Sequence, residues 1–210
     1  DQHLQRAELL ASKRAFDDRY YFCFYAGDQA CVEEFGARYL ELLRNEDSPE
    51  RADVFEAEYA LAMGNPERSI ELLESKLEEG MDSFLRRGSD FVLTLAIAYG
   101  LKGEIEKRDN LLAIEEAMIN ERLANGIWPK LMADDQVKIA AVSGDAELTA
   151  RRLALAIDID ADLSTREIDY HKAFDAVRDD PAVRRQRDRI KAKEDALLER
   201  LYAEGVWSKN

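Results

Sequence analysis

Residues 51–80 constrain the fold of this chain most, because they predict two short amphipathic helices joined by a turn at Gly64-Asn65-Pro66. Apolar residues recur at helical spacing on both sides of the turn. Gly64 can adopt the positive φ that ends a helix, and Pro66 supplies the fixed φ that suits the first turn of the next one. A lone hairpin cannot bury both of its apolar faces, so we expect similar hairpins to stack beside it.

Turn glycines recur along the chain and mark further hairpins. Each is followed by an Asp, Asn or Glu that can cap or favour the start of the next helix. They are Gly27, Gly64, Gly103 and Gly144. The remaining helices are expected over residues 4–25, 29–43, 90–101, 105–124, 129–142, 146–157, 164–177 and 181–203. The sequence therefore predicts an all-α chain in which residues 1–163 form four hairpins of one continuous solenoid, capped by a helix pair within 164–210.

The composition favours helices and argues against nucleic-acid binding and against a membrane span. Hydrophobic residues make up 46% of the 210 residues, and there are only 4 Pro and 10 Gly. The formal net charge of −14 argues against nucleic-acid binding, which needs clustered Lys and Arg. No apolar run approaches the roughly 18 residues that a membrane span requires. The chain opens on Asp1, so we expect an excised or processed piece whose compartment, cytoplasmic or periplasmic, stays open.

Motifs for catalysis and metal binding are missing from the sequence. His3 and His171 are far apart and have no companion Cys pair, so no zinc or iron site is expected. The spacing of Asp158, Asp160 and Asp162 is faintly similar to a calcium loop, but the required Gly and Glu are absent, and a polar loop is expected instead. The basic stretch 184–193 is expected to be a solvated helix face. We expect no enzyme and no cofactor.

Two further features each leave alternatives open. Cys23 and Cys31 flank the Gly27 turn, and either pack as small apolar side chains or form a disulfide in an oxidising compartment. The first hairpin is dense in aromatic residues, which either fill the core and an interface with an upstream repeat or a second subunit, or form a binding surface. Its aromatic residues are Tyr20, Tyr21, Phe22, Phe24, Tyr25, Phe35 and Tyr39.

Over residues 14–157 the hairpins resemble divergent, lengthened tetratricopeptide repeats, whose unit is about 34 residues. The family's small crossing position falls on Ala57, Ala96 and Val137, and its tyrosine position on Tyr99. The small residue of the second helix falls on Ser69 and Thr149, but on Arg108 in the third repeat. The Trp-Leu-Gly start and the closing Pro of the family are absent. The resemblance implies a right-handed superhelix of stacked hairpins.

The C-terminal part is similar to the ends of tetratricopeptide regions in large bacterial signalling proteins. Such regions finish with a phenylalanine helix, an Arg-Asp-Asp-Pro turn and a long charged helix, matched here by Phe174 and by residues 178–181. Parent proteins of that kind include CadC-like winged-helix transcription regulators, adenylate cyclases and Ser/Thr kinases. The resemblance implies that this chain is the C-terminal regulatory part of such a protein.

If the resemblance holds, the first helices of successive hairpins line a groove that binds a peptide or a partner helix without catalysis. The family's inward positions fall on Arg14, Asp17, Tyr21, Phe24, Arg51, Val54, Glu58, Leu61, Phe91, Thr94, Ile97, Asp134 and Lys138. One alternative is a sensor that binds a small molecule between repeats. Another is a scaffold that forms a homodimer through the aromatic first hairpin.

Overall fold

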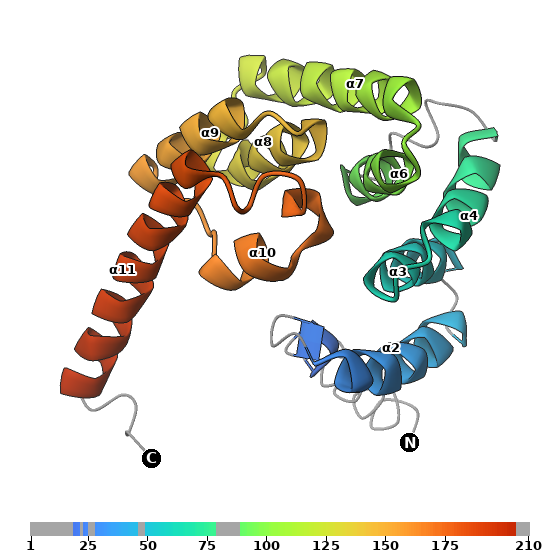
Figure 1. Ribbon diagram of the computed structural model, residues 1–210, viewed down its shortest axis with the longest axis horizontal. Helices are drawn as coiled ribbons and strands as arrows, with labels where there is room; N and C mark the ends of the chain where they lie inside the picture. The colour runs from blue at the N-terminus through green and yellow to red at the C-terminus, as the bar shows by residue number, and fades with distance from the viewer. Residues whose placement is uncertain (1–18, 22, 25–27, 46–48, 79–88, 205–210) are drawn as a thin grey trace. The chain divides into compact units, whose positions relative to one another are not determined.

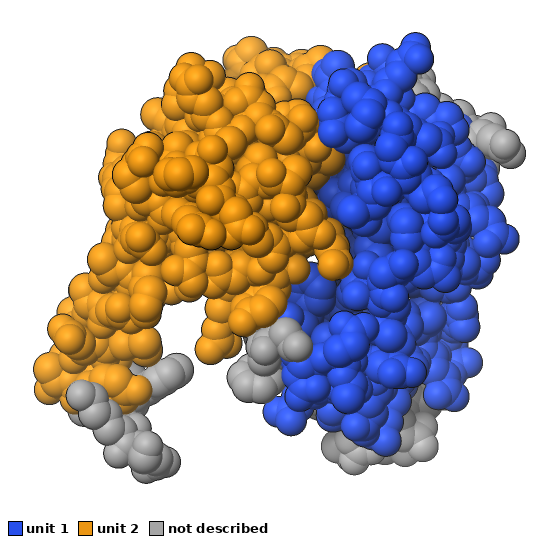
Figure 2. Space-filling view, viewed as in Figure 1, with its two compact units in different colours: residues 1–113 blue, residues 114–210 orange. Residues whose placement is uncertain are grey.

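A computed structural model describes residues 19–21, 23–24, 28–45, 49–78 and 89–204, and within these ranges every regular element is a helix. The chain divides into two compact units, Asp1–Ala113 and Ile114–Asn210. Figure 1 shows the helices in chain order, and Figure 2 colours unit 1 blue and unit 2 orange. The all-α class predicted from the sequence is confirmed. No described helix is long and apolar enough to cross a membrane.

Unit 1 contains α2 (Gln29–Arg44), α3 (Pro49–Ala62), α4 (Pro66–Glu78), α6 (Ser89–Lys102) and the first half of α7 (Ile105–Ala124). Helix α2 packs on α3, α3 packs on α4, and α6 packs on both α3 and α4. The small residues that meet at the predicted helix crossings, Ala57, Ser69 and Ala96, are fully buried. Small side chains at these positions allow the helices of neighbouring hairpins to approach closely.

The turns between helices form as the glycine positions predict. Gly64, Gly103 and Gly144 all have φ between 75° and 81°, a conformation that side chains with a Cβ rarely adopt. After Gly64, the Asn65 side chain accepts a hydrogen bond from the backbone N–H of Arg68, and Asp145 caps α9 in the same way. Gly27 lies outside the described residues, but Asp28 caps α2 by accepting from the N–H of Cys31.

The aromatic residues of the first hairpin form part of the core of unit 1. Tyr20, Tyr39 and Phe55 are buried, and the Phe55 ring meets both tyrosines edge to face. Gly36 allows the close approach of Tyr59, because a Cβ at that position would lie 2.5 Å from the tyrosine ring. The core alternative for these aromatic residues therefore holds for Tyr20 and Tyr39.

A disulfide joins Cys23 to Cys31 at the start of α2, with their Cα atoms 5.5 Å apart. Cys23 is fully buried and Cys31 is half-buried against the same aromatic core. The bridge closes a loop across the predicted Gly27 turn. The open question about the two cysteines is thus resolved in favour of a bridge in this structure.

Unit 2 contains the rest of α7, followed by α8 (Pro129–Ser143), α9 (Ala146–Asp158), α10 (Thr165–Tyr170), the short 3-10 helix η1 (Lys172–Phe174) and α11 (Pro181–Ala203). Helices α8 and α9 form a hairpin, α11 packs on α9, and η1 packs on α8. The interior of the hairpin is filled by Val137, Ala140 and Leu153, which are fully buried.

The helix predicted over residues 164–177 is wrong in its second half, because α10 ends at Tyr170. His171 has extended backbone angles, and its ring nitrogen Nδ1 accepts a hydrogen bond from the N–H of Ala173. The Arg178 guanidinium donates to the carbonyls of Asp169 and His171 at the end of α10. The His171 side chain therefore begins η1, and Arg178 takes the carbonyls at the end of α10, so that this helix ends without Gly or Pro.

Candidate functional site

One face of α8 carries the most exposed large apolar side chains of this region beside a group of charges. Trp128, directly before the helix, is 75% exposed, and Leu131 is 66% exposed. Asp134 and Lys138 follow at spacings of three and four residues, so Leu131, Asp134 and Lys138 share one side of the helix. We call these four residues the α8 outer face. Helix α8 packs on α9, and its residues Ala133, Val137, Ala140 and Ala141 are buried.

Lys138 is held by two carboxylates from different helices. Its Nζ lies 2.5 Å from Oδ2 of Asp134 and 2.9 Å from Oε1 of Glu167 on α10. The Lys138 and Glu167 side chains are only 16% and 12% exposed. The backbone N–H of Glu167 donates to the Ser164 hydroxyl, which caps α10 and fixes this helix end. The charges of Lys138 and Glu167 are therefore largely buried, and their positions are set by two helices.

Burial and neighbouring charges shift the pKa values of this cluster. Burial alone lowers the pKa of Lys138, but Asp134 and Glu167 outweigh burial and raise it above its ordinary value. Burial raises the pKa of Glu167, although the Lys138 ammonium acts in the opposite direction. Burial, followed by the cations Lys138 and Arg178, lowers the pKa of His171 to about 3. Lys138 is thus an ammonium and His171 a neutral imidazole at neutral pH.

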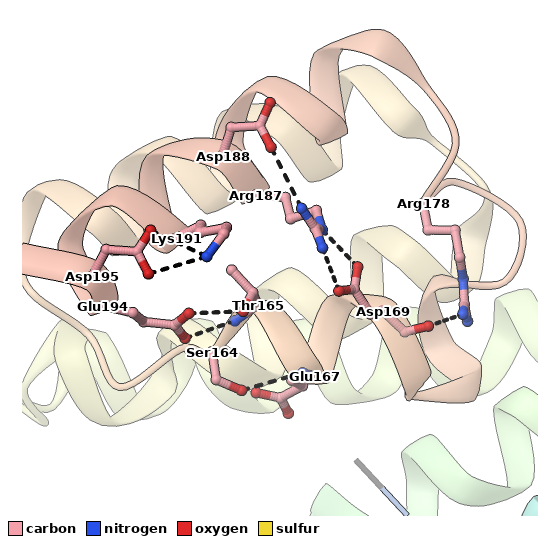
Figure 3. Close-up of polar contacts among 10 residues, drawn as sticks. All are labelled: Ser164, Thr165, Glu167, Asp169, Arg178, Arg187, Asp188, Lys191, Glu194 and Asp195. Carbon is pink, nitrogen blue, oxygen red and sulfur yellow. Dashed lines mark hydrogen bonds and ion pairs between the residues drawn. The ribbon is translucent and has the colours of Figure 1, made fainter. Parts of the chain in front are cut away.

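A row of polar contacts fastens α11 to the preceding part of unit 2. Figure 3 shows the guanidinium of Arg187 directed at the Asp169 carboxylate of α10. Its Nε and Nη2 donate to the two carboxylate oxygens at 2.6 and 2.5 Å. In the same view, both carboxylate oxygens of Glu194 accept from Thr165, one from its N–H and one from its hydroxyl.

Further polar contacts join α11 to the end of α9 and the loop after it. They involve two sequence features that were considered separately above, the aspartates of residues 158–162 and the basic stretch 184–193. Arg189 pairs with Asp158, and Lys193 pairs with Asp160. Two aspartates of the faintly calcium-like loop, Asp158 and Asp160, therefore have basic partners in the stretch 184–193. The basic residues of that stretch are exposed, apart from the half-buried Arg187, as expected for a solvated helix face. Three of them, Arg187, Arg189 and Lys193, also form ion pairs with neighbouring elements. Among the described residues, no three Asp, Glu, His or Cys side chains converge as metal ligands would.

A cavity of about 620 Å³ opens beside the C-terminal half of α11. Its apolar walls come from Ile157 and Leu163, at the end of α9 and in the following loop, and from Ile190 and Leu197 on α11. Lys193, Glu194, Asp162 and Arg200 are among its polar lining residues. The volume lies within the roughly 300–1,000 Å³ typical of small-molecule sites.

The groove residues predicted from the sequence are distributed over both units. Arg14 and Asp17 lie outside the described residues. In unit 1, Tyr21 and Arg51 are exposed, Phe24, Val54 and Glu58 are half-buried, and Leu61, Phe91, Thr94 and Ile97 are buried. In unit 2, the structure brings Asp134 and Lys138 together in one ion pair.

Sequence reasoning missed Trp128, Glu167 and His171 as members of the candidate site. A signal existed for Trp128, because a large aromatic residue directly before Pro129 at a helix start is not required by the hairpin itself. Ser164 and Glu167 have the spacing of a capping box, which marked the start of α10 but not the partner of Glu167. Nothing in the sequence pointed to the burial of His171. No family model, curated protein or solved structure matches this chain.

Proposed function

We propose that this chain is a non-catalytic recognition module whose α8 outer face binds a cationic amphipathic peptide or helix of a partner protein. The observation that carries the proposal is the exposure of Trp128 and Leu131 beside charges held by Lys138 and Glu167. Trp is among the residues that most often dominate binding energy, and fixed neighbouring charges set the register of a bound helix. The tetratricopeptide resemblance, which implies a regulatory part of a larger signalling protein, agrees with this role.

The charge of the partner follows from the groups near this face. Asp134, Glu167 and Asp162 carry negative charges there, whereas Lys138 and Lys130 carry positive ones. The whole chain is also strongly acidic, with a formal net charge of −14. A partner with Leu-type side chains on one side and Lys or Arg on the other would match both the apolar pair and the acidic surroundings.

Titration with two model peptides tests this proposal. One is a helix with a leucine face and lysines elsewhere, and the other replaces every lysine by glutamate. We expect only the lysine peptide to bind, and Trp128→Ala or Leu131→Ala to weaken its binding at least about tenfold, as loss of an interface anchor does. Binding is measured by calorimetry at physiological ionic strength, where non-specific attraction is screened.

Leu155→Ala is the matched control, since Leu155 is 64% exposed but lies on α9 and faces away from the hairpin core. It should leave the affinity unchanged. Unchanged affinity in Trp128→Ala and Leu131→Ala would show attraction to the acidic surface in general, and equal losses for Leu131→Ala and Leu155→Ala would show apolar contact spread over the surface. Either result would refute the assignment of the α8 outer face.

The cavity beside α11 favours a second candidate function, the sensing of a small ligand. Its volume and its apolar walls with a few polar groups are the features expected of such a site. A thermal-shift screen against small metabolites tests this candidate, because a ligand that binds only the folded chain raises the unfolding temperature.

A further inference from the structure

The charged groups around the cavity beside α11 differ in whether they already have partners. Lys193 donates to the carbonyl of Ile157 and to the Asp160 carboxylate. Glu194 uses both carboxylate oxygens to accept from Thr165. These two side chains connect α11 to the opposite wall of the cavity. Because their charged groups already have partners within the chain, we do not expect them to bind a ligand.

Asp162 and Arg200 line the same cavity, but their side chains do not bridge α11 to another element in this way. Both are exposed, and neither side chain forms an ion pair or hydrogen bond with another described residue. An uncompensated carboxylate and an uncompensated guanidinium at one apolar cavity form a complementary pair of binding groups for a molecule that carries both charges.

Helix geometry sets the approximate reach between these two groups. Asp162 lies in the loop whose Asp160 contacts Lys193, and Arg200 follows Lys193 by seven residues on α11. Seven residues of an α-helix advance about 10 Å along its axis. An extended chain of three residues also spans roughly 10 Å. A peptide of that length can therefore place one end near the loop and the other near Arg200.

We propose that this cavity binds a short zwitterionic peptide of two or three residues with apolar side chains. Its amino group is held by Asp162, its carboxylate by Arg200, and its side chains lie against Ile157, Leu163, Ile190 and Leu197. The proposal rests on the second candidate function, the sensing of a small ligand, and names the class of that ligand.

Calorimetric titration with the peptide Leu-Ala-Leu tests both charged contacts separately. Three forms are compared, with free ends, with an acetylated amino end and with an amidated carboxyl end. We expect the free peptide to bind at least about tenfold more tightly than either blocked form, since hydrogen bonds to charged groups carry that much affinity. Arg200→Gln should weaken the free peptide but not the amidated form, and Asp162→Asn should weaken the free peptide but not the acetylated one.

Arg185→Gln is the matched control, because Arg185 is an exposed arginine of α11 that does not line the cavity. It should leave all three affinities unchanged. Circular dichroism checks that each variant keeps its helices, as expected where the substituted side chains form no hydrogen bond or ion pair with another described residue.

Two results would overturn the proposal and are distinguishable. If the blocked and free peptides bind equally well, or if a non-zwitterionic metabolite alone stabilises the chain, the ligand class is wrong but the sensing function stands. If neither peptides nor metabolites raise the unfolding temperature, both the proposed ligand class and the sensing function are wrong.

Discussion

Burial sets the charge state of His171 and makes this residue a source of acid sensitivity. The unfolded chain takes up a proton on His171 as the pH falls through about 6.5, whereas the folded chain takes it up only near pH 3. Between these values the unfolded state binds more protons, so the free energy of unfolding falls as the pH is lowered. The loss approaches about 1.4 kcal/mol per pH unit.

Replacing His171 by Asn tests this prediction, because an Asn oxygen can still accept from the N–H of Ala173. Urea unfolding is measured for both proteins at pH 7 and pH 4.5. We expect the wild-type chain to lose roughly 2 kcal/mol more than His171→Asn over this interval. The comparison isolates His171, since the carboxylates and His3 are the same in both chains. Parallel pH profiles would contradict the buried, neutral state of the imidazole.

The sequence could not predict which charged residues of the site pair with each other. Lys138 and Glu167 are far apart in sequence, and their meeting depends on the rotation of α8 and α10 about their axes. A one-residue turn of either helix would aim the side chain elsewhere by about 100°. The burial of His171 depends in the same way on where η1 rests on α8. Local sequence patterns predict where helices and turns lie, but not how each helix is rotated about its axis.

At the scale of elements, α11 is held more by polar contacts than by apolar burial. Only Val183 and Ile190 are buried along its 23 residues, among those that the structure describes. The contacts of Arg187, Arg189, Lys193 and Glu194 supply the remaining attachment to α9, α10 and the loop between them. An element attached in this way should be sensitive to salt.

The two-point ion pair between Arg187 and Asp169 is the most informative of these contacts to remove. Its side chains are 30% and 31% exposed, so screening by solvent limits its contribution. We expect Arg187→Gln to lower the free energy of unfolding by about 1 kcal/mol in 0.05 M NaCl and by less than half of that in 0.5 M NaCl. Arg185→Gln, without a described partner, should change stability by under about 0.5 kcal/mol. Equal effects of the two substitutions would contradict the role of the ion pair.

The bounds of most elements followed from sequence because their signals are local. Helix α7 begins after Gly103 and ends before Gly126, and α11 begins at Pro181, as the turn and cap rules predict. Helix α10 was predicted too long because its end depends on Arg178, which lies in a later turn and donates to the carbonyls of Asp169 and of His171, the residue after the helix. The pairing of Asp158 and Asp160 with α11 was missed for a related reason. The sequence does not show that the aspartates near residue 160 and the basic stretch 184–193 lie on facing elements.

At the scale of the whole molecule, the division into two compact units predicts separate responses to damage in each core. Leu73 on α4 and Leu153 on α9 are both fully buried, one in each unit. Leu→Ala at such sites costs about 2–5 kcal/mol, through lost burial and the cavity that remains. If each unit opens by itself, the cost should appear only in the local opening free energy of the unit that carries the substitution.

Hydrogen exchange resolved by peptide gives the measurement, with each variant the control for the other. A loss of 2 kcal/mol corresponds to roughly 30-fold faster exchange. We therefore expect Leu73→Ala to accelerate exchange in α3 and α4 by at least about 30-fold and to leave α8, α9 and α11 unchanged, and Leu153→Ala to do the reverse. Acceleration spread evenly over all helices in both variants would show that the chain opens as one cooperative body. The two-unit description would then fail as an account of its stability, because units that open independently must confine such damage to the unit that carries it.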